Sequence, residues 1–151
     1  MLREPLLYLS LFFKQHRQTY YELLQSVREQ GNWGAWLEFF LTGIVETSNQ
    51  AAETARRILT LLEADRRRIE GLGRPASSAL RVHQLMQRRP LITIPAAAAH
   101  LSLSEPTVAK SLEHLTTLQI VRETTGRVRR RMFAYGAYLD LLNEGTEPLP
   151  G

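Results

Sequence analysis

The stretch from Trp33 to Ile69 contains no proline and, after Gly34, only one glycine, Gly43. Apolar or small side chains recur along it at intervals of three and four, at positions 33, 36, 37, 40, 44, 47, 51, 55, 58, 62 and 69. That interval is the repeat of one face of an α-helix. Asn32 can cap the first turn by accepting a backbone N–H. The sequence therefore predicts one helix from Trp33 to about Ile69, roughly 55 Å long at a rise of 1.5 Å per residue.

The two halves of this predicted helix carry different side chains. The first half is bulky and needs packing partners: Trp33, Trp36, Phe39, Phe40 and Ile44. The second half has a narrower stripe of the kind that pairs with another helix: Ala51, Ala55, Ile58 and Leu62. Such a helix overhangs a globule of about 70 residues. A partner surface is therefore implied, either further parts of the same protein or a second copy.

Shorter helical patterns precede this one. Residues 6–13 are almost continuously apolar and predict a short buried helix. A second run, with Tyr20 or Tyr21, Leu24 and Val27 on one face, predicts another helix. Gly31 ends it, since glycine is the preferred residue just after a helix.

The segment from Gly71 to Ser78 is rich in glycine, proline and serine, as linkers are. It divides the chain into residues 1–71, with 9 basic and 9 acidic groups, and residues 72–151, with 10 and 6. The second part therefore carries the whole net charge of +4. We expect two domains, a helical one over 1–71 and a second one over 72–151.

The second part has the element order of a winged helix-turn-helix. Ser77 or Ser78 is expected to cap a helix that runs through Arg89, and Ser104 to cap the helix after the turn. Between them, an extended piece at 91–94 precedes a helix over 96–101 that Pro95 begins. Strand-like segments at 120–124 and 131–135 bracket a glycine-containing loop, the wing, and a helix over 136–143 follows. The expected fold class is thus mainly α with a small β-hairpin.

This arrangement suggests a surface for DNA. The helix after the turn is expected to end near Leu118 and to present short polar side chains and one cation outward: Glu105, Thr107, Lys110, Ser111 and His114. The wing adds the arginines Arg127, Arg129, Arg130 and Arg131. Arginines of this kind neutralise phosphates without reading sequence. Winged helices also serve as protein-docking or oligomerisation modules, and a net charge of +4 is modest for a nucleic-acid binder.

Four stretches resemble the bacterial Fic family of proteins. LLYLSLFFK from Leu6, HRQTYY from His16 and GNWGAWLEFFL from Gly31 are similar to the region just after the Fic active-site motif. AYGAYLDLLNEGTE from Ala134 is similar to the end of Fic proteins that carry a winged helix. The resemblance implies a helical C-terminal segment of a Fic domain followed by a winged helix.

The family transfers AMP from ATP, with magnesium, to a hydroxyl group of a target protein through the motif His-Pro-Phe-x-x-Gly-Asn-Gly-Arg. This chain lacks that motif, because its histidines, His16, His83, His100 and His114, precede Arg, Gln, Leu and Leu. We therefore expect no catalytic residue, no cofactor and no adenylyltransferase activity in this chain alone. By resemblance, Tyr20 and Tyr21 correspond to a tyrosine pair beside the adenine, and Arg28 to a polar nucleotide contact. One alternative is that one tyrosine is core and the other lies at a helix interface.

Composition excludes further classes. There is no cysteine, so disulfide scaffolds, cysteine-ligated zinc and thiol nucleophiles are ruled out, and a cytoplasmic location is permitted. The longest apolar stretch is less than half of the roughly 20 residues that a membrane-spanning helix needs. No metal site is expected. His83 is expected in a helix core, the run Arg66 to Arg68 in solvent, and Ser102 stands where such turns commonly have glycine.

Three hypotheses follow. The first is the non-catalytic C-terminal portion of a Fic-family AMP-transferase, whose winged helix serves regulation, dimerisation or target recognition. The second is a free-standing winged-helix transcriptional regulator that binds DNA as a dimer. The third is an interaction module that contacts neither DNA nor nucleotide.

Overall fold

The computed structural model describes residues 4–126 and 131–144, which form two compact units. The first unit contains helices α1 (Glu4–Gln15) and α2 (Arg17–Gln30) and the beginning of α3 (Trp33–Glu70). The second starts within α3, at Arg57, and runs to Leu142. The chain is mainly helical with one small antiparallel sheet.

The long helix predicted from Trp33 is confirmed, and α3 ends one residue beyond Ile69. The Asn32 side chain accepts a hydrogen bond from Ala35 N at 3.4 Å, as expected of its cap. Gly31 closes α2 in the left-handed conformation at φ 65°. A glycine is suited to this position because other side chains are strained there.

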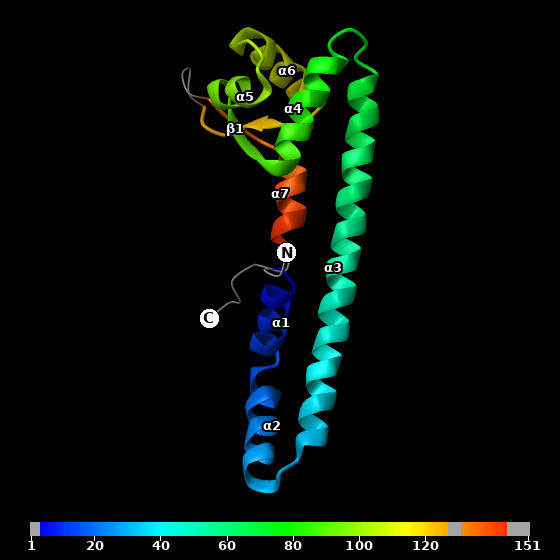
Figure 1. Cartoon of the computed structure of the whole chain (residues 1–151), viewed down its shortest axis with the longest axis vertical. Coiled ribbons are helices and arrows are strands. Elements are labelled where there is room, and N and C mark those ends of the chain that lie inside the picture. Colours follow the sequence, from blue (N-terminus) through cyan, green and yellow to red (C-terminus); the bar gives the residue numbers. More distant parts are fainter. Residues whose placement is uncertain (1–3, 127–130, 145–151) are drawn as a thin grey trace. The chain divides into compact units, whose positions relative to one another are not determined.

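In the first unit, α1 and α2 follow one another along the beginning of α3 (Figure 1). The three helices contact one another through a cluster of aromatic rings. Phe12 is buried and its ring lies 5.2 Å from that of Phe39, while Phe13 lies 5.2 Å from Tyr20. Gly43 lets α1 approach α3, because a Cβ there would lie 2.7 Å from the Phe12 ring.

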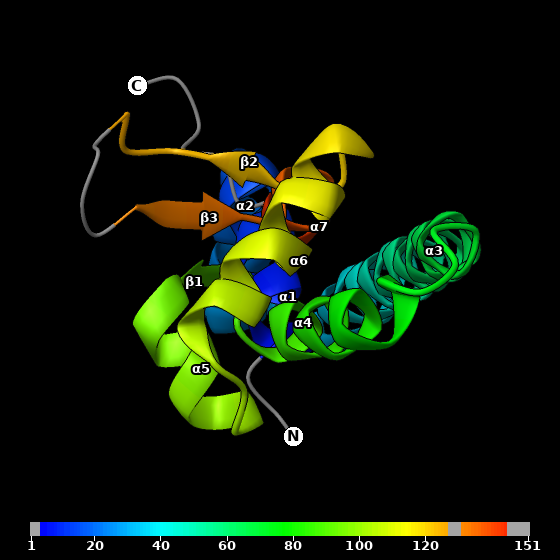
Figure 2. The same ribbon diagram turned by 90° about the horizontal axis from the view of Figure 1, so that it is seen from above.

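The second unit contains the remaining elements in the order helix, strand, helix, helix, strand, strand, helix. They are α4 (Ala76–Arg88), β1 (Leu91–Thr93), α5 (Ile94–Leu101), α6 (Glu105–Thr117), β2 (Arg122–Glu123), β3 (Met132–Ala134) and α7 (Gly136–Asn143). The strands form one sheet in the order β1-β3-β2, and Figure 2 shows β2 and β3 side by side near α6. Ile92 pairs with Phe133, and Glu123 pairs with Phe133 from the other side.

Most element boundaries in this unit agree with the sequence patterns, and one prediction is wrong. Neither Ser77 nor Ser78 caps α4, which already begins at Ala76. Pro75, with φ −69°, already has a helical backbone, so the helix starts directly after it. The Ser78 hydroxyl donates to the carbonyl of Pro75 at 3.2 Å.

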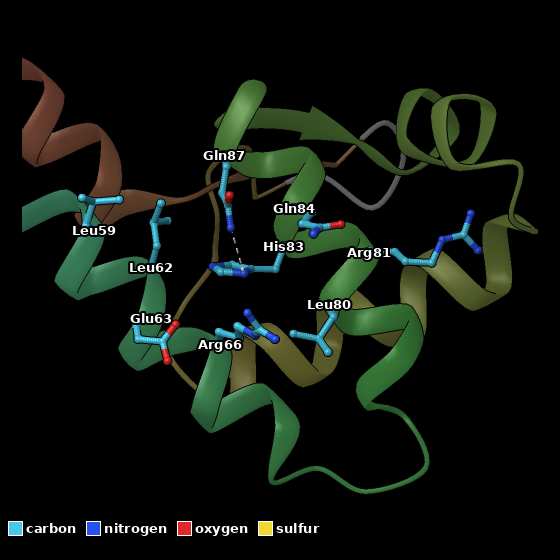
Figure 3. Close-up of a pocket in the computed structure, with 9 residues that line it drawn as sticks. All are labelled: Leu59, Leu62, Glu63, Arg66, Leu80, Arg81, His83, Gln84 and Gln87. Atoms are coloured by element: carbon cyan, nitrogen blue, oxygen red, sulfur yellow. Dashed lines mark hydrogen bonds between the residues drawn. The ribbon is translucent and has the colours of Figure 1, made fainter. Parts of the chain in front are cut away.

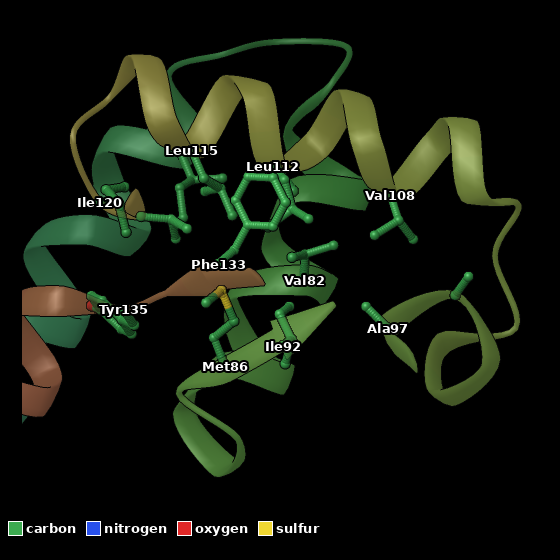
Figure 4. Packing of buried hydrophobic residues seen from close by; sticks show 14 residues of the cluster. Val82, Met86, Ile92, Ala97, Val108, Leu112, Leu115, Ile120, Phe133 and Tyr135 are labelled. Atoms are coloured by element: carbon green, nitrogen blue, oxygen red, sulfur yellow. The ribbon is translucent and has the colours of Figure 1, made fainter. Parts of the chain in front are cut away.

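The core of the second unit lies between α4, α5, α6 and the sheet (Figure 4). Val82, Met86, Val108, Leu112 and Leu115 have no exposed surface. The end of α3 belongs to this core, because Ile69 is fully buried in it. The compact unit therefore begins at Arg57, before the Gly71–Ser78 linker, which lies inside it.

Gly43 provides a test of the helix contact in the first unit. Gly43→Ala is expected to be less stable than Gly34→Ala by about 1–3 kcal/mol, because its methyl group must displace the Phe12 ring. Gly34 lies in the same helix with no atom nearer than 4.0 Å to an added Cβ, so it controls for helix propensity. Urea denaturation followed by circular dichroism gives both free energies of unfolding. Equal stability of the two variants would show that α1 does not pack on Gly43.

Candidate functional site

The turn before α6 contains one left-handed residue and a side-chain cap. Ser102 takes up the left-handed conformation at φ 51°, the position where glycine is common in such turns. Ser104 then caps α6 as predicted: its Oγ accepts from Thr107 N at 3.3 Å. Its hydroxyl also lies 2.8 Å from Thr107 Oγ1. The first turn of α6 is thus fixed by side-chain hydrogen bonds.

The outward face of α6 differs from the prediction at one residue. Glu105 and Lys110 are exposed, and Thr107 and His114 are half-buried. Ser111 is only 1% exposed, and its hydroxyl donates to the carbonyl of Thr107 at 2.9 Å. Its assignment to the outward face was wrong, because it lies three residues after Val108 and so shares the core face.

The outward face of α6 carries more acidic than basic side chains. Lys110 Nζ lies 3.0 Å from a carboxylate oxygen of Glu113, and both side chains are exposed. Glu105 stands in the first turn of α6, where the helix dipole favours a carboxylate. The outward face therefore has two carboxylates for one ammonium group, which lowers its attraction for phosphate.

The hairpin that follows is held by a carboxylate. Glu123 Oε1 accepts from Thr125 N at 2.7 Å and from Gly126 N at 3.1 Å. Hydrogen bonds from Thr125 lower the pKa of the Glu123 carboxyl. Arg131 lies over the Phe133 ring, 5.4 Å from its centroid. The other predicted wing residues, Arg127, Arg129 and Arg130, lie outside the described residues.

The residues assigned to a nucleotide lie on α2. Tyr20 is half-buried, and its ring packs 5.4 Å from that of Trp36. Tyr21 is 56% exposed and has the guanidinium of Arg17 above its ring at 5.6 Å. Arg28 is also exposed and stands two helical turns after Tyr21, on the same face. The structure thus separates the tyrosine pair into one packed ring and one accessible ring.

A chain of hydrogen bonds joins α3, the residue after β3, and α4. The Tyr135 hydroxyl donates to Asp65 Oδ2 at 2.6 Å. Because its hydrogen is used in that bond, the Tyr135 hydroxyl oxygen accepts a hydrogen bond from His83 Nε2 at 3.2 Å. His83 Nδ1 in turn accepts a hydrogen bond from Gln87 Nε2 at 3.4 Å. All polar atoms of His83 are satisfied in this neutral tautomer. The expectation that His83 is a core residue is confirmed, since it is 1% exposed.

Sequence reasoning missed Asp65 and Tyr135. Asp65 is 3% exposed although it is a carboxylate, and Arg68 contacts it at 3.0 Å. The signal was available: an acidic residue at position 65 falls between Leu62 and Ile69 on the apolar face of the helix. Arg66, Arg67 and Arg68 are exposed, as expected, and Arg68 also donates to the carbonyl of Leu118. The Arg68 guanidinium thus pairs from the surface with the buried carboxylate of Asp65, which offsets part of the cost of burying that charge.

A pocket of about 360 Å³ lies beside this network, between α3 and α4 (Figure 3). Its lining consists of Leu59, Leu62, Glu63, Arg66, Leu80, Arg81, His83, Gln84 and Gln87. The charges on the α3 side are already paired: Glu63 contacts Arg67 at 3.1 Å, and Arg66 contacts Glu70 at 2.9 Å. The pocket therefore offers leucines and amides but few free charges to a ligand.

A search of the chain against models of known protein families finds no match. Within residues 4–126 and 131–144, no three histidine or acidic side chains converge as a metal site requires. In the same part of the chain, none of the helices combines the length and the apolar character needed to cross a bilayer.

The buried histidine predicts how stability depends on pH. Burial lowers the pKa of folded His83 below the usual value of 6.5, and the charge of Asp65 opposes this only in part. The unfolded chain therefore binds a proton first as the pH falls. Stability from this group is complete above pH 6.5 and is lost as the pH falls below that value toward the lowered pKa of the folded state.

We expect the free energy of unfolding to fall between about pH 7.5 and about pH 5.5 in the natural protein and to fall less in His83→Gln. Urea denaturation at both pH values measures this difference. His100→Gln is the matched control, because His100 is exposed. The same pH dependence in His83→Gln as in the natural protein would contradict the expectation.

Proposed function

We propose that this chain is the non-catalytic C-terminal portion of a Fic-family protein AMP-transferase. Its first unit forms one wall of the nucleotide site, and its second unit is a winged helix-turn-helix for regulation, dimerisation or recognition of a target. The AMP transfer itself requires the His-Pro-Phe motif, which this sequence lacks. ATP and magnesium are accordingly bound by the whole domain.

The observation that carries this proposal is a row of exposed apolar side chains on α3 in the first unit. They recur at four-residue spacing and line a groove of about 690 Å³: Leu37, Leu41 and Val45, exposed by 52%, 57% and 58%, follow Trp33, which is 60% exposed. A row of this kind is costly in water and marks an interaction surface. In a complete Fic domain, other helices of that domain would cover it.

The accessible face of α2 supports the nucleotide assignment. Tyr21 offers an exposed ring on which a base can stack, and Arg28 offers an exposed guanidinium on the same face. The packing of Tyr20 against Trp36 makes its ring a support for Tyr21, 5.4 Å away. One stacked ring contributes about 1–3 kcal/mol, too little to hold ATP without a phosphate-binding loop. The first unit therefore contributes to the nucleotide site without constituting it.

The element order of the second unit supports the winged helix. A helix, a strand, two helices around a left-handed turn and a two-stranded hairpin succeed one another, as such a domain requires. In this interpretation α6 is the recognition helix and the loop between β2 and β3 is the wing.

The proposal is tested first by sequencing the genomic DNA upstream of the codon for Met1. We expect the reading frame to continue upstream and to encode the His-Pro-Phe motif. In the complete protein, Tyr21→Ala is then expected to raise the KM for ATP about tenfold through loss of stacking. Gln18→Ala, on the same helix but engaged with Glu22, is the control and should leave the KM unchanged.

Two results would overturn the proposal. One is an in-frame stop codon upstream with no motif between it and Met1. The other is a motif-bearing protein whose KM for ATP is the same in Tyr21→Ala as in the natural form.

A second candidate function is a free-standing winged-helix regulator that binds DNA. It is favoured by the Ser104 cap, which fixes α6 with Lys110 exposed. It predicts DNA binding that weakens steeply with salt and falls in Lys110→Ala and Arg129→Ala. Fluorescence anisotropy of a labelled duplex over a series of salt concentrations measures it. Binding that is insensitive to salt and to both changes would exclude this function.

A further inference from the structure

The stretch from Gly71 to Ser104 contains four arginines and two histidines but no aspartate or glutamate. Its arginines alone give a formal charge of +4, which equals the net charge of the whole chain. This stretch contains α4 and α5. Arg81 and Arg88 lie on α4, His100 lies on α5, and neither helix carries a carboxylate, in contrast to α6.

A groove of about 420 Å³ lies between α4 and the end of α5. Its lining combines three basic side chains, two amides and two leucines: Arg81, Arg88, His100, Gln84, Gln87, Leu85 and Leu101. Residues 81, 84, 85 and 88 share one face of α4, because they are three, four and seven positions apart. The volume is within the range of pockets that hold small molecules, about 300–1,000 Å³.

The cations of this groove differ from those of α6 and of the end of α3. Arg66, Arg67, Arg68 and Lys110 each have a carboxylate oxygen within 3.1 Å. In contrast, Arg88 and His100 have no ion pair with any side chain of residues 4–126 and 131–144. Arg81 donates to the carbonyl of Leu101, which leaves its other N–H groups for a ligand.

The helix ends at the groove do not cancel its charge. Arg88 lies in the last turn of α4 and His100 in the last turn of α5, where backbone carbonyls contribute about −0.5 of a charge per helix. Two guanidinium groups contribute +2, so the groove keeps a net positive charge of about +1 before His100 is counted. An anion is therefore attracted to it.

The lining suits a phosphate group attached to a small organic molecule. A guanidinium presents its N–H groups as a planar fork that matches two phosphate oxygens. Gln84 and Gln87 offer further amide groups, and Leu85 and Leu101 offer apolar contact for the organic part. A DNA duplex fits this groove less well than a small molecule, because a concave groove encloses a compact ligand better than a long, rigid rod.

We propose that the groove between α4 and α5 binds the phosphate group of a small phosphorylated molecule. Arg81 and Arg88 hold the phosphate oxygens, and the two leucines contact the rest of the ligand. None of the residues assigned above to DNA or to the nucleotide lines this groove. The site is therefore independent of the function proposed above.

The test is a titration of the 15N-labelled full chain with phenyl phosphate and with inorganic phosphate, followed by NMR. We expect saturable shifts at Gln84, Gln87 and His100, with phenyl phosphate binding more tightly than inorganic phosphate. Sodium chloride at equal ionic strength controls for screening.

Arg88→Gln is expected to raise the Kd for phenyl phosphate about tenfold, through loss of a charge-assisted hydrogen bond. Arg74→Gln is the matched control, because Arg74 is exposed in the same acid-free stretch but does not line the groove. Its Kd should change by less than about twofold. Arg88→Lys keeps the charge but loses the fork, and its Kd should lie between those of the other two variants.

The outcomes separate the sources of phosphate. Shifts that never saturate, or that weaken equally in Arg88→Gln and Arg74→Gln, would overturn the proposal in favour of general charge attraction. Saturable binding of a duplex DNA at these residues without saturable binding of phenyl phosphate would also overturn it, and would assign the groove to nucleic acid.

Discussion

The hydrogen bond from Tyr135 to Asp65 joins segments that are 70 positions apart in the chain. A buried carboxylate costs several kcal/mol unless it is bonded and paired, and Asp65 receives both the Tyr135 hydroxyl and the Arg68 guanidinium. Burial and this bond together raise the pKa of Tyr135 far above its usual value of 10.0. The hydroxyl thus keeps its proton and remains a donor throughout the physiological range.

This interaction explains why the last turns of α3 belong to the second unit. Ile69 supplies apolar contact one turn after Asp65, and Arg68 reaches the carbonyl of Leu118 just after α6. The end of α3, the end of α6 and the end of β3 are therefore fastened to one another by polar bonds around an apolar core. Residues 71–75 then connect two helices within one compact unit, although the segment has the composition of a linker.

Charge is distributed so that the second unit has two distinct surfaces. On the exposed face of α6, Glu105 and Glu113 accompany Lys110, and one of these carboxylates already engages the ammonium group. No acidic residue accompanies Arg81 and Arg88 on α4 or His100 on α5. A partner that binds the exposed face of α6 must tolerate its carboxylates, and a protein surface can do so. An anion is instead attracted to the groove between α4 and α5. The proposed winged helix and the proposed anion groove are thus compatible on one small domain.

Periodicity and local chemistry determined the elements themselves. The length of α3, the Asn32 and Ser104 caps, the end of α2 at Gly31 and the three strands all follow from neighbouring residues. The tertiary structure decided what those elements bury. Ser111 is polar, yet it faces the core because a hydroxyl can satisfy itself on the preceding turn. Tyr20 and Tyr21 are adjacent residues of the same type. Packing of the Tyr20 ring against Trp36 is what makes Tyr20 half-buried while Tyr21 stays exposed. Asp65, Tyr135 and His83 come from segments that are far apart in the chain, and no local pattern indicates that they meet. The helix and strand periods show which face of an element is apolar, but they do not show which other element packs against that face.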